Sequence, residues 1–453
     1  MHTLINTPQV AESLTGVPRY LRAVSSLMKI TSLVVAALPL AASLNLATPA
    51  RPAATAGRCS NIRAIALDAP PEQLPTLSDA IPDCPRTTWD ADELDIEFWQ
   101  KKYKEEDLPL CPIEVIATPE ANAQGVAYFS ERRDELKAML EKHGTIWFRE
   151  FDLMKDEEGF RRMWEALDLD PCLDPLHSSG LRKFLAKKDA VYEEVNKQSL
   201  SKHYIGLHNE STNKKAAKAA AFVCFKPATV FGGEFFIADG ERIFRDMDPA
   251  VLRELYDRKV RISAVNLDLD VLGTLPDGLK ETAMEKAMEL VDKTIIPKFD
   301  MDFELIYGTD GNDMRLQAIE EIQPPVNRHP DTGRPAWFCN MHNQARFLRD
   351  RRPCAVPEVG MTDIYFGDLS LIPGEMLQHV NKVCEDSIVR VPMKPGDVLL
   401  CDNYRVLHGR DIFEGDRLHA VSWFGDEKYD VADTGGATGD VLNNLLNTFL
   451  VGK

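Results

Sequence analysis

The sequence has few cysteines, and none of them form a C-x-x-C pair. Nine cysteines are scattered through 453 residues, so neither a zinc ribbon nor a disulfide framework is indicated. Their odd number and long spacings favour a reducing compartment. An excess of basic residues is also missing, because 53 Lys and Arg stand against 71 Asp and Glu, for a net charge of -18. Nucleic acid needs a basic face, so we expect no nucleic-acid partner.

No apolar run of membrane-spanning length is evident near the N-terminus. The apolar stretch 31–47 contains Pro39 and polar interruptions, and it is shorter than the ~20 residues that span a bilayer, so we expect no stable membrane anchor. Residues 1–66 are nonetheless basic, rich in Ser, Thr and Ala, and almost free of acids. This composition predicts a cleavable targeting segment for a plastid or mitochondrion. A secretory signal and a disordered tail of a cytoplasmic protein are the alternatives.

The remaining composition is that of a globular protein. An apolar content of 44% and a charged content of 27% exclude a disordered chain, and the length allows one large domain or two smaller ones. The sequence shows no repeats. We divide it into the targeting segment or disordered tail 1–66, an irregular Pro-rich lead-in 67–110, a main domain 111–430 and a C-terminal tail 431–453.

Short apolar runs separated by Gly and Pro dominate the second half of the chain. They predict strands at 222–225, 234–238, 261–267, 335–339, 388–392, 398–401 and 418–424. Helices are predicted at 128–143, at 156–169, after the N-cap Asp248 and at 278–295. Many short strands with a few helical excursions indicate a mainly β protein, a double-sheet barrel with peripheral helices.

Two distant stretches carry residue types that bind metals. His208 and Glu210 are two residues apart, so in an extended chain both side chains point to the same face. His408 lies shortly after the predicted strand 398–401. Two imidazoles and one carboxylate are the ligand set with which proteins hold non-haem Fe(II) and leave positions open. We predict a metal site formed by these three residues, although an isolated H-x-E is more often an exposed polar strand end.

Polar residues near these stretches are candidates for supporting roles. The polar residues around His408, which are Asp402, Asn403, Arg405 and Arg410, could orient its imidazole. Arg417 precedes an apolar strand, and its planar guanidinium suits bidentate binding of a carboxylate; the alternative is a surface ion pair. Asn340 follows the predicted strand 335–339 and either faces the pocket or caps the strand.

Five segments, in order along the chain, resemble the TauD/TfdA family of Fe(II)/2-oxoglutarate-dependent oxygenases. They are IGLHNE (205–210), FVCFKPATVFGGEFFIAD (222–239), HPDTGRPAWF (329–338), DIYFGD (363–368) and KPGDVLLCDNYRVLHGRDIFEGDR (394–417). The last segment is the most specific. Its HGR-x-x-F-x-G-x-R string, together with a Glu ligand, is most similar to the SyrP-like amino-acid hydroxylases.

The resemblance implies a double-stranded β-helix, the jelly-roll core of clavaminate synthase-like enzymes, with peripheral helices. It implies that His208, Glu210 and His408 bind Fe(II) and that Arg417 holds the distal carboxylate of 2-oxoglutarate, with O2 as the other co-substrate. The expected reaction is hydroxylation of a small polar or amino-acid-like molecule, with release of succinate and CO2. Halogenases of the family replace the carboxylate ligand by a small residue, so Glu210 favours hydroxylation, or a related desaturation.

Two features depart from the family pattern. The family usually has Thr after Gly-Gly-Glu, where its hydroxyl helps to hold 2-oxoglutarate, but this chain has Phe235. A phenyl ring cannot donate that hydrogen bond, so we expect support from another residue, such as Asn340 or Thr229. The lysine-rich segment 211–221 is expected to form part of a lid over the substrate. Its lysines either attract an anionic substrate or form a solvated face.

Two further hypotheses remain open at this point. A binding or scaffold protein could have kept the jelly roll and its metal site without catalysis, which Phe235 and the segment 211–221 would favour. An oxygenase could also use a co-substrate other than 2-oxoglutarate. The retained ligand set favours the 2-oxoglutarate-dependent enzyme over both.

Overall fold

The structure is a computed structural model that describes residues 81–86, 93–175, 184–186, 191–193, 201–268, 276–294, 303–307, 315–352 and 363–425. The predicted segments 1–66 and 431–453 lie outside these residues, so the targeting segment and the tail remain predictions.

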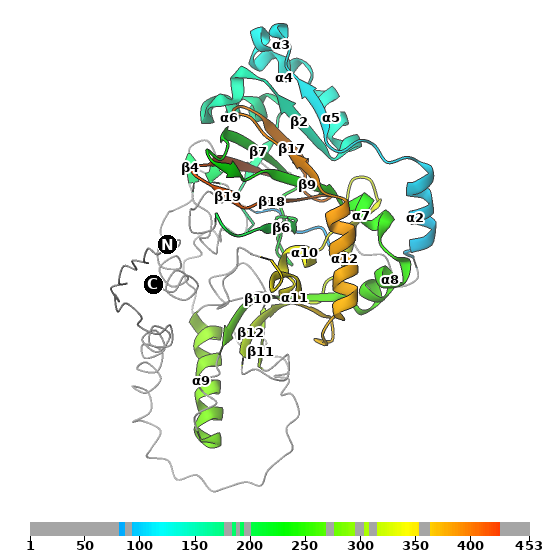
Figure 1. The fold of residues 1–453 in the computed structure, drawn as a ribbon, viewed down its shortest axis with the longest axis vertical. Helices are drawn as coiled ribbons and strands as arrows, with labels where there is room; N and C mark the ends of the chain where they lie inside the picture. The colour runs from blue at the N-terminus through cyan, green and yellow to red at the C-terminus, as the bar shows by residue number, and fades with distance from the viewer. Residues whose placement is uncertain are drawn as a thin grey trace, which may run out of the picture.

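Two β-sheets form the centre of the molecule (Figure 1). The larger sheet has the order β1-β2-β17-β7-β20-β5-β4, with β3 paired to β20. Its strands are β1 (Ile113–Ile116), β2 (Thr145–Arg149), β3 (Asp170–Cys172), β4 (Phe184–Ala186), β5 (Val191–Glu193), β7 (Ala219–Lys226), β17 (Val398–Asp402) and β20 (Leu418–Gly425). The smaller sheet has the order β16-β9-β18-β6, with β6 (Ile205–His208), β9 (Phe235–Asp239), β16 (Val389–Val391) and β18 (Val406–Arg410).

The path of the chain between these sheets is that of a jelly roll. Strands β5, β6, β7 and β9 alternate between the larger and the smaller sheet, and so do β16, β17, β18 and β20 in the reverse sense. All pairings among these strands are antiparallel. This arrangement confirms the predicted double-stranded β-helix, since a jelly roll is two Greek keys in two facing sheets.

Strand β7 shows why these apolar runs form central strands. Its inward side chains, such as Phe222 and Cys224, belong to the core between the two sheets. Its outward side chains, such as Ala221 and Val223, belong to a second core beneath the helices that cover the larger sheet. Because both faces are buried, the strand reads as a continuous apolar run and not as an alternation.

Helices cover the outer face of each sheet (Figure 1). On the larger sheet lie α3 (Pro119–Gln124), α4 (Val126–Glu131), α5 (Arg133–His143), η3 (Asp152–Lys155) and α6 (Glu157–Ala166). The core behind the smaller sheet takes side chains from α2 (Ile96–Glu105), α7 (Gly240–Asp246), α8 (Pro249–Arg258), α10 (Met341–Gln344), α11 (Arg346–Arg349) and α12 (Gly374–Asp386).

The chain between the two halves of the jelly roll forms smaller sheets and one long helix. They comprise β10 (Val260–Asp268), β11 (Phe303–Tyr307), β12 (Arg315–Glu320), β13 (Val326–Arg328), β14 (Pro335–Trp337), β15 (Asp363–Phe366) and α9 (Asp277–Thr294). A short pair, β8 (Phe231–Gly232) and β19 (Phe413–Glu414), joins two loops next to the barrel. As predicted, the helix at 278–295 lies outside the central sheets (Figure 1).

Two predictions about local structure are wrong in part. The lead-in 67–110 is not irregular throughout, because Asp95 caps the helix α2, accepting a hydrogen bond from Phe98 N. Its residues Ile96 and Tyr103 are buried in the core behind the smaller sheet, so tertiary packing outweighs the neighbouring prolines. The helix predicted at 128–143 is divided at Arg132, whose ψ of 16° interrupts it between α4 and α5.

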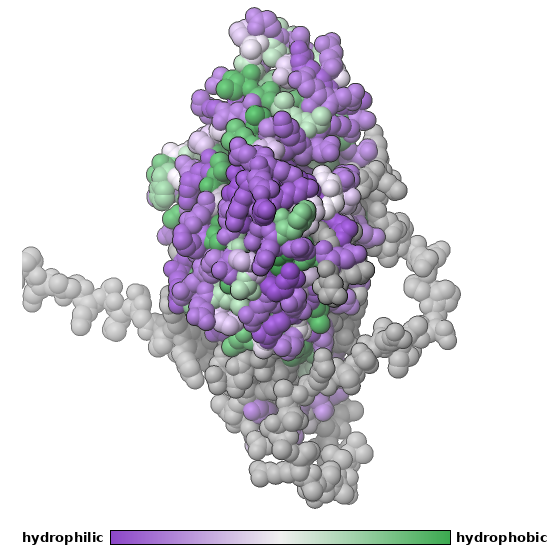
Figure 2. Space-filling view, turned by 90° about the vertical axis from the view of Figure 1, so that its right-hand side faces the viewer, coloured by the Kyte–Doolittle hydropathy of each residue, from purple (hydrophilic) through white to green (hydrophobic). Residues whose placement is uncertain are grey.

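The molecular surface is hydrophilic, as the composition of a globular protein predicts. The face drawn in Figure 2 is mostly hydrophilic, with apolar side chains in small, scattered groups. None of the helices that the structure describes is long and apolar enough to cross a membrane.

A glycine allows the strand that carries His408 to approach its neighbours. A Cβ on Gly409 would lie 2.6 Å from the carbonyl oxygen of Ile205 and would also collide with the ring of Phe236. Both belong to the strands on either side of β18. No larger residue can occupy this position while β6, β18 and β9 keep their spacing.

We expect Gly409→Ala to lower the free energy of unfolding by about 1–3 kcal/mol, because the methyl group overpacks the smaller sheet. Urea unfolding measures the change. Gly278→Ala is the control, since an added Cβ there meets no atom within 4 Å. Equal midpoints for Gly409→Ala and the wild type would show that β6 and β18 do not approach as described.

Candidate metal centre

The three predicted ligands meet between the two sheets. The donor atoms of His208, Glu210 and His408 all lie within 4.8 Å of one another. Strand β6 contributes His208 and β18 contributes His408, and the two residues are direct partners in the antiparallel pair. Their ring centroids are 4.3 Å apart. Glu210 follows two residues after His208 and is buried, so the H-x-E spacing places both side chains on the inner face, as predicted.

A backbone contact fixes the orientation of the His208 ring. Its Nδ1 lies 2.8 Å from the carbonyl oxygen of Gly206. A carbonyl can only accept, so Nδ1 carries the proton and Nε2 presents its lone pair to the centre. This is the arrangement by which proteins orient a metal-binding histidine and raise its basicity.

Aromatic rings surround His408 on the inner face. Phe222 lies 4.7 Å and Trp423 6.2 Å from its ring, measured between centroids. Phe235 is stacked nearly parallel to the imidazole, at 5.9 Å and 7°. All three aromatic side chains are buried, so they restrict the imidazole and keep water away from this side of the site.

Two asparagines clamp the backbone of the H-x-E stretch. Asn340 Oδ1 accepts from Asn209 N at 2.9 Å, and Asn340 Nδ2 donates to Asn209 O at 3.2 Å. Asn403 does the same for Glu210, accepting from its N at 3.0 Å and donating to its O at 3.1 Å. Each amide thus pairs with the two polar backbone atoms of one residue, which fixes the direction of the Glu210 side chain.

These clamps change the roles expected for two residues. Asn403 was expected to orient the His408 imidazole, but its amide instead holds Glu210 and also donates to Ala217 O at 2.7 Å. Asn340 was expected to bind the co-substrate, and the structure shows its amide engaged with Asn209. Co-substrate binding by Asn340 stays a prediction, and the observed contacts assign it a positioning role.

The outer edge of β6 is held by a buried histidine. Leu207 N donates to His342 Nδ1 at 2.8 Å, while His342 Nε2 lies 2.9 Å from Glu385 Oε1. Burial lowers the pKa of His342 despite the opposing effect of its hydrogen bond to Glu385. A neutral ring with its proton on Nε2 satisfies both contacts, so His342 supports the strand and does not face the metal centre.

Arg417 is buried at the start of β9. Its Nε donates to Gly233 O at 3.2 Å, and its guanidinium lies 5.7 Å from the ring centroid of Phe413. Gly233 has φ of 71°, and a Cβ there would lie 3.1 Å from Arg417 Cδ, so the glycine makes room for the arginine. The alternative of a surface ion pair is wrong, since Arg417 is 5% exposed.

Two of the three lysines in the segment 211–221 are held in ion pairs. Lys215 is buried, with its Nζ 2.7 Å from Asp83 and 3.2 Å from Ile81 O, and Lys218 lies 3.4 Å from Asp331. Residues 219–221 belong to β7 and not to a lid. Thr229 is exposed, and its hydroxyl accepts from Asp416 N at 2.9 Å. It therefore does not replace the missing threonine hydroxyl in the barrel.

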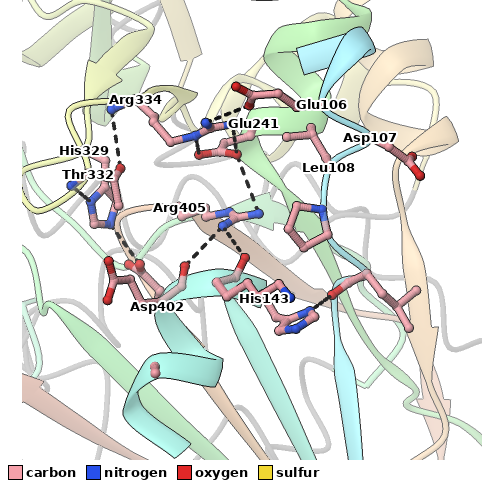
Figure 3. A pocket seen from close by; sticks show the side chains of 15 residues that line it. Glu106, Asp107, Leu108, His143, Glu241, His329, Thr332, Arg334, Asp402 and Arg405 are labelled. Atoms are coloured by element: carbon pink, nitrogen blue, oxygen red, sulfur yellow. Dashed lines mark hydrogen bonds and ion pairs between the residues drawn. The ribbon is translucent and has the colours of Figure 1, made fainter. Parts of the chain in front are cut away.

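An outer cavity of about 790 Å³ is lined by Asp402 and Arg405, the two ends of the turn 402–405 (Figure 3). Arg405 lies in the cavity wall and forms a bidentate pair with Asp239, at 3.1 Å through Nε and 2.7 Å through Nη2. Arg334 pairs with Glu241 at 2.9 Å in the same wall. None of the three metal-site donors is among the residues that line this cavity.

His329 and Asp402 form an ion pair in the same wall, with Nε2 2.8 Å from Oδ2 (Figure 3). Burial by itself lowers the pKa of the imidazole, but the hydrogen bond and charge of Asp402 outweigh it, so the pKa of His329 is raised above its usual value. The pair anchors the turn whose next residue, Asn403, holds Glu210.

The three donors fit a non-haem iron ion. One carboxylate and two imidazoles from one face match the ligand set that leaves positions open for other ligands. The separations are small enough for one ion to contact all three after small side-chain rotations. Within the part of the chain that the structure describes, this is the group of His, Cys, Asp and Glu donors with such spacing.

Comparison with known proteins gives an independent result. A family model described as "Taurine catabolism dioxygenase TauD, TfdA family" matches residues 107–423. The chain is 24% identical over 304 residues to the dapdiamide synthesis protein DdaC of Enterobacter agglomerans, covering 63% of this chain and 83% of that protein. It is 23% identical over 335 residues to a clavaminate synthase-like protein of Arabidopsis thaliana, covering 70% and 94%. A solved structure of asparagine oxygenase has a TM-score of 0.41 at 12% identity, covering 69% of this chain and 93% of that one.

We expect Asn403→Ala to weaken Fe(II) binding by about 10- to 100-fold, because the Glu210 backbone loses both contacts that fix the carboxylate. Anaerobic Fe(II) titration measures the change. Asn122→Ala is the matched control, since its amide also makes two backbone hydrogen bonds, to Glu150 O and from Asp152 N, but at the surface. Unchanged affinity in Asn403→Ala would contradict the clamp.

The His329–Asp402 pair predicts a pH dependence of stability. Because the folded-state pKa of His329 is raised, its stabilisation is fully present below the unfolded-state pKa of about 6.5 and is lost as pH rises through the folded-state value. We expect the free energy of unfolding of the wild type to fall over that window by more than that of His329→Gln.

Urea unfolding at several pH values from about 5.5 to about 8.5 tests this expectation. His379→Gln is the control for the substitution itself, since it replaces a histidine that contacts Asp248 N outside the cavity. Parallel curves for the wild type and His329→Gln would show that the pair does not contribute in this way.

Proposed function

We propose a function that proceeds from one premise: the chain belongs to the TauD/TfdA family of dioxygenases. Membership confirms the enzyme class and cofactors expected from the sequence, a non-haem iron dioxygenase that depends on 2-oxoglutarate. We propose further that it hydroxylates a small polar or amino-acid-like substrate and releases succinate and CO2. The similarity to the SyrP-like branch stays a prediction.

The convergence of His208, Glu210 and His408 carries this proposal. These three residues would hold Fe(II), which supplies the redox chemistry that couples decarboxylation of 2-oxoglutarate to oxygenation of a C–H group. The presence of Glu210 favours hydroxylation over halogenation. Its carboxylate would occupy the coordination position that chloride takes in halogenases of the family.

The remaining residues of the site would bind the co-substrate, orient it and exclude water. Arg417 would hold the distal carboxylate of 2-oxoglutarate, which its burial and its contacts with Gly233 O and Phe413 support. Phe222 and Trp423 form apolar walls next to His408. Such walls keep water from the reacting groups and strengthen the electrostatic contacts inside.

Polar side chains next to Glu210 favour a polar substrate. A small cavity there is lined in part by Arg86, Ser211, Glu320 and Asn340. Its free volume of about 10 Å³ holds about one water, so a substrate group must replace that water or displace a wall. Burial raises the pKa of Glu320 to about 7, so this carboxyl group can act as donor or acceptor near neutral pH.

A second candidate is a binding protein that keeps the metal site without turnover. Phe235 favours it, because a buried phenyl ring stands where the family has a hydroxyl. Such a binding protein would bind Fe(II) but never convert 2-oxoglutarate. The hypothesis of an oxygenase with another co-substrate is not supported, because the chain belongs to the TauD/TfdA family.

We expect anaerobic addition of Fe(II) and 2-oxoglutarate to produce the weak visible charge-transfer band of the chelate. His408→Ala and Glu210→Ala should reduce the band and succinate formation to background, because each removes a proposed ligand. His379→Ala is the matched control, a histidine on α12 outside the barrel. Succinate released with a pool of polar metabolites measures turnover.

Absence of the band in the wild type, with Fe(II) and 2-oxoglutarate in excess, would overturn the proposed function. A band without succinate from any substrate, or from uncoupled turnover, would favour the binding protein.

A further inference from the structure

We propose that Arg410 is a second cationic contact for the distal carboxylate of the co-substrate, next to Arg417. The inference rests on the proposed function, because it concerns the same site. It gives Arg410 a role other than the one expected from the sequence, which was to orient the imidazole of His408. The argument depends on which face of β18 carries Arg410, on what surrounds its guanidinium and on which other groups could take this role.

Arg410 points into the barrel, on the same face as His408. The two residues are two apart on β18, whose pairing with β9 is regular from Val406 to Arg410, so they share a face. Cross-strand partners also share a face, and the partner of Arg410 is Phe235, which stacks on His408. The spacing along β18 and the pairing with Phe235 therefore both place the Arg410 side chain on the inner face. Arg410 is fully buried, at 0% exposure.

The two arginines converge on one aromatic ring. The guanidinium carbon of Arg410 lies 5.0 Å, and that of Arg417 5.7 Å, from the ring centroid of Phe413. Arg410 Nη1 donates to Asp411 O at 2.7 Å. The Asp411 carboxylate is directed to Arg390, at 2.6 Å. Two guanidinium groups therefore lie against one ring at the end of β18, close to the start of β9.

This position suits the far end of a five-carbon dicarboxylic oxo acid. Two residues along a strand advance about 6.6 Å, so Arg410 lies about that far along β18 from His408. An oxo acid that chelated a metal at His408 through the oxygens on its first two carbons would reach about this distance with its fifth carbon. A guanidinium is suited to that carboxylate because its planar N–H groups match both oxygens.

The other groups considered for this role have no polar atom or have their side chains engaged in other contacts. Phe235 has no polar atom, Thr229 is exposed with its hydroxyl bound to Asp416 N, and the Asn340 amide pairs with the Asn209 backbone. Arg410 is the direct cross-strand neighbour of Phe235. It is thus placed to supply the donors that the phenyl ring does not.

The test compares two oxo acids that chelate alike but differ at the far end. The dissociation constants of 2-oxoglutarate and 2-oxobutyrate, which lacks the distal carboxylate, are measured on the anaerobic Fe(II) protein from the charge-transfer band. We expect Arg410→Gln to weaken 2-oxoglutarate by about 10- to 100-fold, the range for a hydrogen bond to a charged group. Binding of 2-oxobutyrate should stay within about twofold.

Arg261→Gln is the matched control, because it removes another buried guanidinium, paired with Glu304 at 2.9 Å outside the barrel. It should leave both dissociation constants unchanged. Arg410→Lys keeps the charge without the planar fork, and we expect a smaller loss that is again confined to 2-oxoglutarate. This variant decides the question if Arg410→Gln does not fold.

Unchanged 2-oxoglutarate binding in the Arg410 variants would overturn the inference and leave the proposed function intact. Equal weakening of both oxo acids would also overturn it, because Arg410 would then support the metal centre and not the distal carboxylate. If the wild type forms no chelate with either acid, the proposed function fails first and the inference with it.

Discussion

The pairing of β6 with β18 is the constraint on which the candidate site depends. It places His208 opposite His408 and turns both imidazoles to the space between the sheets. A slip of one residue would turn every side chain of the shifted strand to the opposite face. Gly409 lets β18 lie close to both neighbours, and His342 and Asn343 accept hydrogen bonds from the outer edge of β6. The register is therefore fixed by backbone contacts on both strands.

The third donor is held by a different device. Glu210 lies beyond the end of β6, where no strand partner fixes its backbone. The amides of Asn340 and Asn403 take the place of a strand ladder there. Because these groups are buried, losing one amide would leave polar backbone atoms unpaired, at a cost of about 1–3 kcal/mol each. The carboxylate is positioned by hydrogen bonds between residues that are far apart in the sequence.

Much of this could be predicted from the sequence, and the reasons are physical. The H-x-E spacing and the period of two in a strand place His208 and Glu210 on one face. Apolar runs such as that of β7 indicate strands buried on both faces, and five ordered segments resemble one family. These signals are local, or repeat along the chain, so they can be recognised without the fold.

What was missed depends on contacts between distant segments. Asn340 and Lys215 are polar residues whose partners, Asn209 and Asp83, are more than 130 positions away. Helix α2 was overlooked because its buried face has meaning only against the core behind the smaller sheet. Arg410 lies within the most specific of the five segments. Its burial beside Phe413 depends on the path of the loop that follows β18. The spacing of residues along the sequence does not indicate which distant residues form such pairs.

The central claim is that one Fe(II) ion binds to His208, Glu210 and His408. Anomalous diffraction at the iron edge, from crystals grown anaerobically with Fe(II), tests it most directly. The account predicts one strong peak about 2.0–2.2 Å from an imidazole nitrogen of each histidine and from a carboxylate oxygen of Glu210, as for comparable divalent metal ligands. A peak elsewhere, or none between these three side chains at full Fe(II) loading, would contradict it.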